Sequence, residues 1–376
     1  MRKIKSLSLL CVILGLLVIL TGCPETVHMG ESNQEQNQVN TGNSNNKAPD
    51  KGQESVKPKG MVYFNYFDTV SNIYCYANET QENFEAKCNG VTSILGEYHQ
   101  LFDIYYEYSG VANLRTINLN AGKDAVEVDE KLIDFLLYAK ELYQITNGEM
   151  NIMMGSVLKL WHNCREEAST NPSSARIPTE QELAEANAHT SISSLEIDEV
   201  NNTVRITDPE ASIDVGALGK GYATEKAAEY LRNNGGESYV LNIGGNIRII
   251  GHKPDGSGWK TGIKNPANTS SYAAYLTLAD TSCVTSGNYE RYYMVKGQKY
   301  HHIIDKDTLM PADFFTSVTI ITKDSGLADA LSTALFSMSY EDGLAMVEKI
   351  GGVDVLWITA DGTQYMTPGL SSLIAK

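Results

Sequence analysis

Apolar residues recur at helical spacing in several stretches of the chain. Between residues 129 and 146 they stand three or four positions apart, at Leu132, Phe135, Leu136, Ala139 and Leu142. This spacing predicts an amphipathic helix, which the pair Asn147-Gly148 ends as a left-handed cap would. Similar patterns predict helices over residues 83–102, 180–188, 328–338 and 341–350, and a further helix that ends near Leu231.

Strand-like segments are interspersed among these helices. Residues 61–77 are rich in aromatic and β-branched side chains, which favour strands. Further strands are predicted at 195–197, 203–206, 213–215, 239–242, 246–251, 273–278, 292–295, 353–358 and 364–367. We expect a turn-rich connection over 104–118 and a polar loop over 165–176. Strands and helices come in mixed runs and not in strict alternation, which favours an α+β fold with substantial antiparallel sheet.

The chain begins with a pattern typical of export. Basic residues precede an apolar run, and small residues then precede Cys23. Because this arrangement resembles the bacterial lipobox, we expect a signal peptide over 1–22 and lipid on Cys23; an ordinary secretory peptide is the alternative. Residues 23–60 are polar and predicted to form a disordered tether. Residues 61–376 would form the folded domain, held on the outer side of a bacterial cell membrane.

Composition narrows the choice of function. Hydrophobic residues make up 42% of the chain and charged residues 20%, as in ordinary globular proteins. The formal net charge of −16 argues against a nucleic-acid partner, since binding to nucleic acid requires a basic face. Four cysteines lie in the folded part: Cys75, Cys88, Cys164 and Cys283. They form no zinc-like spacing, so buried free thiols are expected, with a disulfide such as Cys75–Cys88 as the alternative.

The segment SIDVGALGKGYATEK, residues 212–226, is the first candidate for chemistry. It combines a predicted short strand, a turn with three glycines, a lysine and a helix start. Glycines permit positive φ and close approach of a ligand, and a helix N-terminus offers unpaired N–H groups to an anion. The pattern matches neither a Walker loop nor the dinucleotide motif, and a tight strand-to-helix turn without ligand remains the alternative.

Three other clusters add candidates. The Gly244-Gly245 pair is either a hairpin turn or a place where a flat ligand lies against backbone. His301 and His302 would point to opposite faces of a strand, so only one can face a given site. Asp329 and Thr333 stand four residues apart and share a helix face. They could be Mg²⁺ ligands, or they could simply complement the helix dipole and bond to backbone.

Taken together and in order, these segments resemble the ApbE family, the FAD:protein FMN transferases. The matching segments are FDTVSNI, SGVANLRTIN, TNGEMNIMMGSVLKLW, SIDVGALGKGYATEK, YVLNIGGNIRI, TSGNYERYY, HHIID, TSVTIIT and LADALSTALF. The resemblance covers nearly the whole folded part. It implies an ApbE-like fold with mixed, largely antiparallel sheets flanked by helices and an FAD site between the two halves.

The resemblance also implies roles for individual residues. Those at FAD-contacting positions are Phe67, Tyr105, Glu149, Met150, Asn151, Asp214, Lys220, Ile303 and Ile304. Asp329, Thr333 and the carbonyl of Ala217 match metal ligands. His302 is our candidate for the general base. The chain departs from the family pattern at Phe67, at 149–151 and at Ser332, where some members have a second Asp. Lys306 replaces a proline and Leu309 a glycine, so we expect that loop to differ in shape without loss of chemistry.

The implied reaction moves the FMN half of FAD, with Mg²⁺, to a Thr or Ser hydroxyl of an exported acceptor protein and releases AMP. The acceptor site is expected to be flanked by glycine. Phosphoryl transfer mainly requires positioned donors and neutralised charge, which fits a lysine, a helix start and a metal. Two alternatives remain at this point: hydrolysis of FAD to FMN and AMP, and a lipoprotein that binds FAD without turnover.

Overall fold

The computed structural model describes residues 58–375. Its centre is an eight-stranded sheet in which every pair of neighbours is antiparallel. In spatial order the strands are β1 (Lys59–Tyr66), β2 (Thr69–Cys75), β6 (Tyr239–Ile243), β7 (Asn246–Ile250), β10 (Ser282–Gly287), β13 (Ser317–Thr322), β14 (Asp354–Ile358) and β15 (Gln364–Met366). The predicted α+β class with a largely antiparallel sheet is confirmed.

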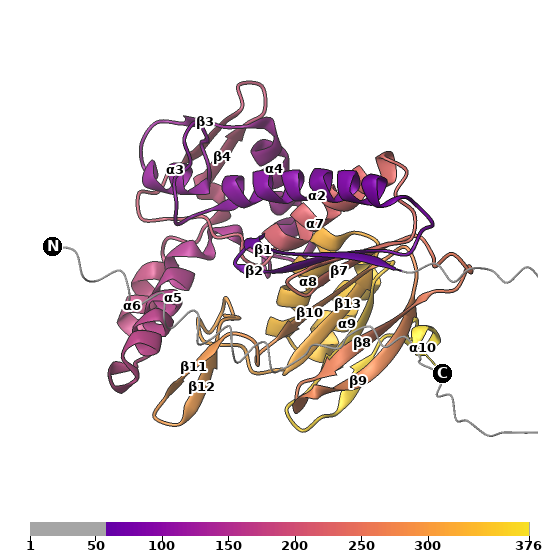
Figure 1. Ribbon diagram of the computed structural model, residues 1–376. Helices are drawn as coiled ribbons and strands as arrows, with labels where there is room; N and C mark the ends of the chain where they lie inside the picture. The colour runs from indigo at the N-terminus through magenta and orange to yellow at the C-terminus, as the bar shows by residue number, and fades with distance from the viewer. Residues whose placement is uncertain (1–57, 376) are drawn as a thin grey trace, which may run out of the picture.

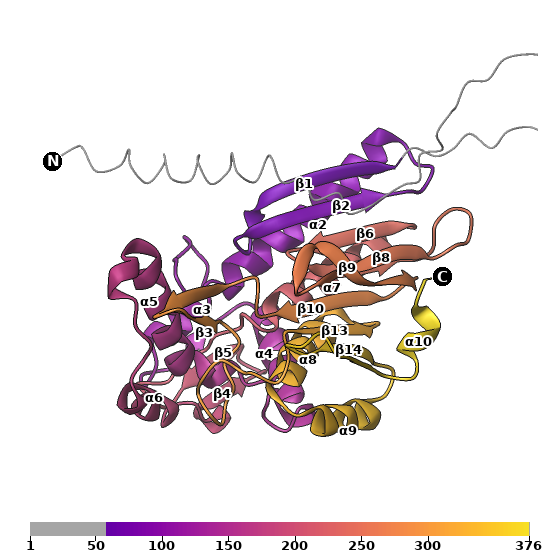
Figure 2. The same ribbon diagram turned by 90° about the horizontal axis from the view of Figure 1, so that it is seen from below.

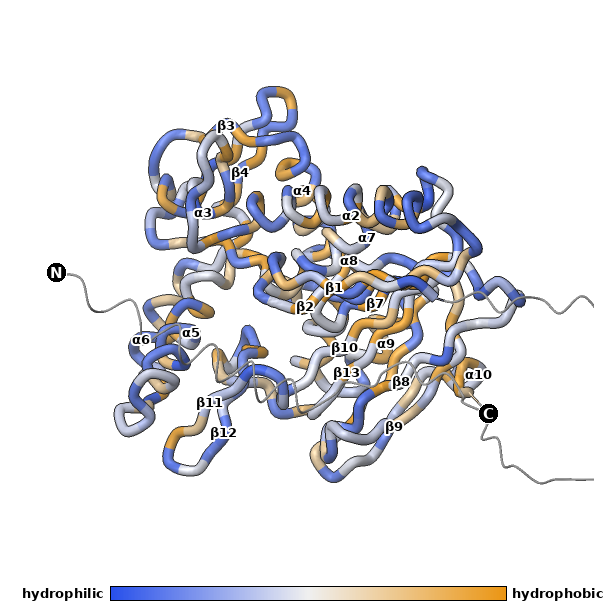
Figure 3. The backbone as a smooth tube through the Cα atoms, in the orientation of Figure 1, coloured by the Kyte–Doolittle hydropathy of each residue, from blue (hydrophilic) through white to orange (hydrophobic). Residues whose placement is uncertain are grey.

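Helices cover one face of this sheet. They are α2 (Gln81–Phe102), α7 (Gly219–Asn233), α8 (Ser325–Ala334), which continues into the 3₁₀ turn η4 (Leu335–Ser337), and α9 (Tyr340–Ile350) (Figure 1). The apolar side of α2 packs on β2 and β6 in one core cluster, and α8 and α9 pack around the fully buried Trp357 in another. Figure 3 shows that hydrophobic stretches gather on the central strands between these layers.

The opposite face of the sheet is covered only in part. The hairpin of β8 (Trp259–Asn265) and β9 (Asn268–Leu278) and the short α10 (Leu370–Leu373) pack there against β7, β10, β13 and β14. Seen from below, β1 and β2 extend beyond this hairpin (Figure 2). Val62, Phe64 and Val70 on these two strands are exposed.

A second, mainly helical part lies beside the sheet (Figure 1). It contains α3 (Leu114–Leu119), α4 (Glu130–Ile145), η1 (Ile152–Met154), α5 (Gly155–Thr170), η2 (Pro172–Ser174), α6 (Glu180–Asn187), η3 (Ile192–Ser194) and a small sheet of β3 (Val126–Glu127), β5 (Thr203–Ile206) and β4 (Leu195–Asp198). The hairpin of β11 (Tyr292–Val295) and β12 (Gln298–His301) reaches across to α5, where Tyr293 joins the cluster around Trp161.

Most predicted elements are confirmed, and three predictions are wrong. The polar loop over 165–176 is mainly helix, because Cys164 and Ala168 bury one face of α5 as far as Thr170. The connection over 104–118 contains the start of α3, which Asn113 caps. Residues 213–215 are not a strand. Their extended backbone donates instead from Ile213 to the Asn118 side chain and from Asp214 to the Ile152 carbonyl.

The cysteine prediction is confirmed within the described residues, where Cys75, Cys88, Cys164 and Cys283 are buried and unpaired. Among residues 58–375, no helix is both long and apolar enough to cross a membrane. The predicted signal peptide, the lipid on Cys23 and nearly all of the 23–60 tether lie outside the described residues. They therefore stay predictions.

Candidate active site

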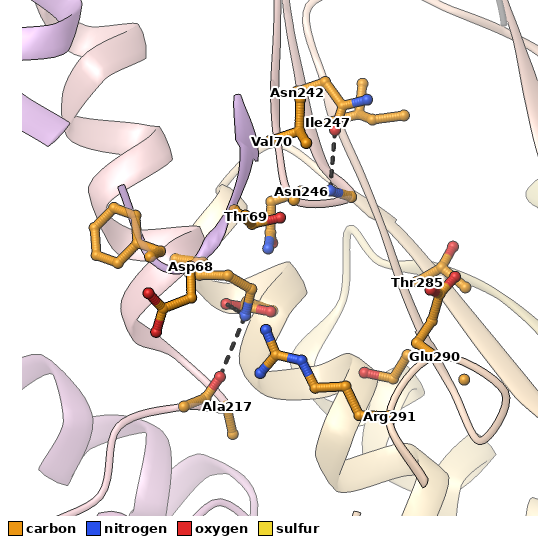
Figure 4. A pocket seen from close by; sticks show the side chains of 18 of the residues that line it. Asp68, Thr69, Val70, Ala217, Asn242, Asn246, Ile247, Thr285, Glu290 and Arg291 are labelled. Carbon is orange, nitrogen blue, oxygen red and sulfur yellow. Dashed lines mark hydrogen bonds and ion pairs between the residues drawn. The ribbon is translucent and has the colours of Figure 1, made fainter. Parts of the chain in front are cut away.

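A cavity of about 1800 Å³ lies between the helical part and the large sheet. Ten of the sequence-predicted residues line it: Phe67, Tyr105, Asp214, Ala217, Lys220, His302, Ile303, Ile304, Asp329 and Thr333. Residues separated by more than a hundred positions, such as Ala217 and Asp329, therefore border one space. Figure 4 shows part of this cavity with Ala217 at its wall.

Asp329 is the most constrained of these residues. It lies in the second turn of α8, a helix that Asp324 caps by accepting from the Leu327 N–H. Asp329 is 5% exposed, and its Oδ2 accepts a 2.8 Å hydrogen bond from the Gly221 N–H. Burial raises the pKa of Asp329, while Lys220, whose Nζ is 3.6 Å away, favours the ionised form. The result is a buried carboxylate that depends on nearby positive charge.

The hydrogen bond from Gly221 has a consequence for Ala217. In a continuing helix the Gly221 N–H would donate to the carbonyl four residues earlier, which is that of Ala217. Here that N–H is directed to Asp329, so the Ala217 carbonyl oxygen keeps no such donor. A side chain at Gly221 would collide with the Ser325 carbonyl and with Asp329. Glycine is therefore needed here for close approach of α7 and α8.

This corrects the expected role of the glycines in the 216–221 turn. Gly216, Gly219 and Gly221 all have negative φ, so none of them uses the left-handed region that glycine permits. Asp214 Oδ1 accepts from the Gly216 N–H at 2.8 Å, and Lys220 Nζ donates to the Gly216 carbonyl at 3.3 Å. The turn is thus closed by its own side chains and is not shaped as a nest for phosphate.

A second carboxylate, that of Glu225, links α7 and α8 one helical turn away from the Gly221–Asp329 bond. Glu225 of α7 accepts from the Ser325 N–H, at the start of α8, at 3.0 Å. It also accepts from Arg248 at 2.9 Å and from Arg232 at 2.7 Å. Asp329 of α8 accepts from Gly221 near the start of α7, so each helix supplies a carboxylate to the N-terminal turn of the other. This reciprocal arrangement fixes the register of α7 and α8, and with it the position of Asp329 relative to Ala217.

The oxygen atoms in and around Asp329 are suitable ligands for a hard cation. Asp329 and Thr333 offer a carboxylate and a hydroxyl, and Ala217 offers a carbonyl. Asn246, 2% exposed, also lines the cavity; its amide donates to Asp329, while its Oδ1 is buried without a hydrogen-bond partner. Oxygen donors of this kind are those that Mg²⁺ prefers. In the part of the chain that the structure describes, no three His, Cys, Asp or Glu side chains are grouped so that they could hold a metal ion, so a site here depends on hydroxyl, amide and carbonyl oxygens beside one carboxylate.

Ser332 does not contribute to this set of donors. It is fully buried, and its Oγ lies 2.8 Å from Ser286 Oγ on β10 and 2.9 Å from the Asp329 carbonyl. The hydroxyl thus joins α8 to the sheet, and Ser332 is not among the residues that line the cavity. Where some family members have a second Asp, this chain has a buried hydrogen bond between two serines.

His302 lies just beyond the end of β12. Its Nδ1 is 3.2 Å from the Arg291 carbonyl, which can only accept, so Nδ1 carries the hydrogen and Nε2 has the lone pair. Burial, with Arg291 nearby, lowers the pKa of His302 to about 3. The ring is therefore neutral at pH 7. His301 is buried and its Nε2 lies 2.8 Å from the Ala312 carbonyl. Both histidines line the cavity, so the prediction that only one of them can face the site is wrong; β12 ends at His301, and strand alternation does not extend to His302.

Arg291 is a residue that the sequence reasoning missed. It lines the cavity, and Figure 4 shows its guanidinium pointing into the space beside Ala217 and Asn246. Its position in the segment TSGNYERYY could have indicated it, because the turn between β10 and β11 borders the cavity. Gly244 and Gly245, with φ of 58° and 93°, form the β6–β7 hairpin turn and also line the cavity. The hairpin-turn alternative is thus confirmed, and a flat ligand against this backbone stays a prediction.

Glu149, Met150 and Asn151 are not among the residues that line the cavity. Asn151 Oδ1 caps η1 by accepting from the Met153 N–H, and its amide donates to the Thr190 carbonyl. Met150 is 2% exposed. Glu149 forms a 3.2 Å ion pair with Lys306. The side chains of these three residues are thus engaged elsewhere, and their predicted contact with FAD has no support in the geometry.

Two departures from the family sequence pattern in the loop after His302 have specific contacts, while the expected difference in loop shape stays a prediction. Lys306, in place of proline, pairs with Glu149, which itself departs from the family pattern. Leu309, in place of glycine, adopts the left-handed region with φ of 59°. Its carbonyl accepts a 2.9 Å hydrogen bond from Trp161 Nε1, and its side chain packs on the cluster around Trp161. These contacts hold a backbone conformation that costs a leucine about 1–2 kcal/mol.

Comparisons with known proteins agree with this geometry. A sequence model described as the ApbE family matches residues 67–357. An FAD:protein FMN transferase of Klebsiella pneumoniae is 29% identical, with 73% of this chain and 83% of that protein covered. One of Vibrio cholerae is 30% identical, with 72% and 80% covered.

Solved structures give the same result. The crystal structure of an ApbE protein of Thermotoga maritima has a TM-score of 0.75 at 27% identity and covers 85% of this chain and all of that one. The flavin transferase ApbE of Vibrio cholerae has a TM-score of 0.69 at 26% identity, with 84% of this chain and all of that one covered.

Proposed function

The chain belongs to the ApbE family, and we propose that it transfers the FMN half of FAD to a Thr or Ser hydroxyl of an exported protein, with Mg²⁺, and releases AMP. The relatives named above are FAD:protein FMN transferases. The observation that carries the proposal is the convergence of Asp329, Ala217 and Lys220 on one cavity, since these groups neutralise and position phosphate oxygens.

In the proposed reaction the acceptor oxygen forms a bond to the phosphorus of the FMN half, and the bond from that phosphorus to the AMP oxygen breaks. Lys220 and Arg291 bring positive charge to the phosphate oxygens, where negative charge develops in the transition state. The hydroxyl proton moves to Nε2 of His302, which is unprotonated at pH 7. The electron pair of the broken bond leaves with AMP.

Asp329, Thr333 and the Ala217 carbonyl would hold Mg²⁺, with Asn246 Oδ1 beside them. When bound, the ion supplies Lewis-acid neutralisation of the pyrophosphate charge. Metal binding requires the ionised form of Asp329. Although Asp329 is buried, the Gly221 N–H and Lys220 both favour its ionised form.

The proposal is tested by incubating the protein with FAD, Mg²⁺ and a peptide that carries one Gly-flanked threonine. A fluorescent flavinylated peptide and an equal amount of AMP are expected. If AMP appears at the same rate without any peptide, the protein is an FAD hydrolase instead. If FAD binds and no AMP appears with or without peptide, it is an FAD-binding protein without turnover.

We further propose that Cys23 carries lipid and holds the enzyme on the outer side of the bacterial cell membrane. The support is the sequence pattern at 1–23. Growth with radiolabelled palmitate should label the wild-type protein and leave Cys23→Ser unlabelled. Equal labelling of the two proteins would contradict the anchor.

A further inference from the structure

The cavity has a second part that the proposed FAD contacts do not use. We call it the sheet arm. It is formed by the face of β1, β2, β6 and β7 that points away from the helices, together with the β8–β9 hairpin. The strand register places its residues on one face, since Val62 pairs with Asn72, Asn72 with Asn242, and Asn242 with Ile247.

Part of the sheet arm is apolar and uncovered. The β8–β9 hairpin buries Ile249 and Trp259 on the same face of the sheet, but it stops short of β1 and β2 (Figure 2). There Phe64 is 70% exposed, Val62 51% and Val70 43%. A sheet face that meets only water is normally polar, so clustered apolar side chains at this place indicate a binding surface.

The charge of the sheet arm is opposite to that of the whole protein. Lys253, Lys260 and Lys264 line it, in a chain of formal net charge −16. Lys260 lies over the ring of Tyr275 at 4.4 Å, and Lys264 pairs at 3.3 Å with Glu290. Glu290, which pairs with Lys264, and Asp68 of the β1–β2 turn also line the cavity, so lysines outnumber carboxylates among these residues. A ligand of the sheet arm should therefore carry carboxylates as well as apolar groups.

The sheet arm opens directly into the part of the cavity that holds Asp329. Asn242, Asn246 and Thr285 lie where the two parts meet (Figure 4). The whole cavity, at about 1800 Å³, exceeds the range of about 300–1,000 Å³ that is usual for small-molecule sites. All ten lining residues predicted to contact FAD, metal or the transferred proton lie outside the sheet arm. Space for a second, larger substrate therefore remains beside the reacting groups.

We propose that the sheet arm binds the acceptor polypeptide, as an extended segment with apolar and acidic side chains next to the hydroxyl that receives FMN. This rests on the proposed function, because only a transferase needs a polypeptide in this cavity. The sheet arm is concave and opens toward Asp329, which favours a polypeptide. A lipid surface could contact Phe64 and the lysines only if they stood on a convex face.

The test compares two short fluorescein-labelled peptides of equal length, each with one Gly-flanked threonine. One has alternating Phe and Glu on both sides, and the other has Ser and Lys. Binding is measured by anisotropy and transfer by flavin attachment, with wild-type protein, Val62→Ser/Phe64→Ser and Lys260→Glu. Val200→Ser, at an exposed valine of the β4–β5 turn, and Lys349→Glu, on α9, are the matched controls.

The Phe/Glu peptide should bind wild-type protein at least about tenfold more tightly than the Ser/Lys peptide, and both sheet-arm changes should remove most of that difference. FAD binding and the controls should be unchanged. Equal binding of the two peptides, or variants that bind as wild type, would overturn the proposal. So would variants that lose only binding to anionic phosphatidylglycerol vesicles. Because anisotropy needs no turnover, selective peptide binding without flavin attachment would reject the transferase and keep the docking surface.

Discussion

Two regions border the same cavity and are built in different ways. The α7–α8 pair is held by two buried carboxylates, Glu225 and Asp329, each bonded to the backbone of the other helix. The loop from His302 to Pro311 is held by hydrogen bonds from its own backbone to the buried Asp305, by the partly exposed pair Lys306–Glu149 and by a bond from Trp161 to the strained Leu309. The first region allows little change, because a charge left alone in the interior is costly. The second tolerates two departures from the family pattern.

The largest effect is expected at Asp329. Asp329→Asn keeps the size of the side chain and removes the charge, so Mg²⁺-dependent transfer should fall by at least about a hundredfold. Flavin attachment measured over a range of Mg²⁺ concentrations tests this. Thr333→Ser, which keeps a hydroxyl, is the matched control and should retain most of the activity. An Asp329→Asn protein with wild-type metal dependence would remove this residue from the metal site.

Glu225 should have the next largest effect, on stability. Glu225→Ala removes the nearer carboxylate of Arg248, which is 3% exposed and then keeps only the longer 3.6 Å pair with Asp280, and it takes the acceptor from the Ser325 N–H at the start of α8. The free energy of unfolding should fall by about 3–5 kcal/mol. On the same helix, Glu229 pairs with Lys226 at 3.2 Å at the surface, and Glu229→Ala should cost less than about 1 kcal/mol. Equal losses in urea unfolding would show that the reciprocal arrangement contributes nothing special.

The pH dependence separates the two regions further. Burial lowers the pKa of both His301 and His302, the latter to about 3, so the folded state takes up fewer protons than the unfolded state as pH falls. Stability should therefore be full above about pH 6.5 and should be lost progressively from there toward pH 3. His302→Asn should flatten that decline in thermal melts. His302→Asn should also remove transfer activity. In the wild type, the fall of kcat/KM on the acid side of the pH profile should occur well below pH 6.5. An unchanged slope would contradict a His302 ring that stays neutral in the folded state.

The smallest effect is expected for the Lys306–Glu149 pair. Its side chains are 27% and 15% exposed, so solvent screens part of the attraction. A double-mutant cycle with Lys306→Met and Glu149→Gln should give a coupling of about 0.5–1 kcal/mol, with kcat changed less than about threefold. A large fall in kcat would show that activity depends on the contacts of this loop as strongly as on those of the α7–α8 pair.

The same contrast explains what the sequence could predict. Periodicity predicted α4 and α8 and placed Asp329 and Thr333 on one face, because those relations are local. The strands β10 and β13 were missed, since both faces of β13 are buried and its sequence shows no alternation. Two contacts depend on tertiary packing, and the local sequence pattern could not predict them. Glu225 contacts Ser325, a hundred residues later in the chain, and Lys306 contacts Glu149.

The central claim is that one cavity joins FAD, Mg²⁺ and a polypeptide hydroxyl. Mass spectrometry of a Thr peptide after incubation with FAD tests it most directly, with and without Mg²⁺ and with wild-type or Asp329→Asn protein. We predict that the peptide gains the mass of one FMN phosphoester, with AMP in equal amount, only with wild-type protein and Mg²⁺. An unmodified peptide beside accumulating FMN and AMP, or a modified peptide without Mg²⁺, would contradict the claim.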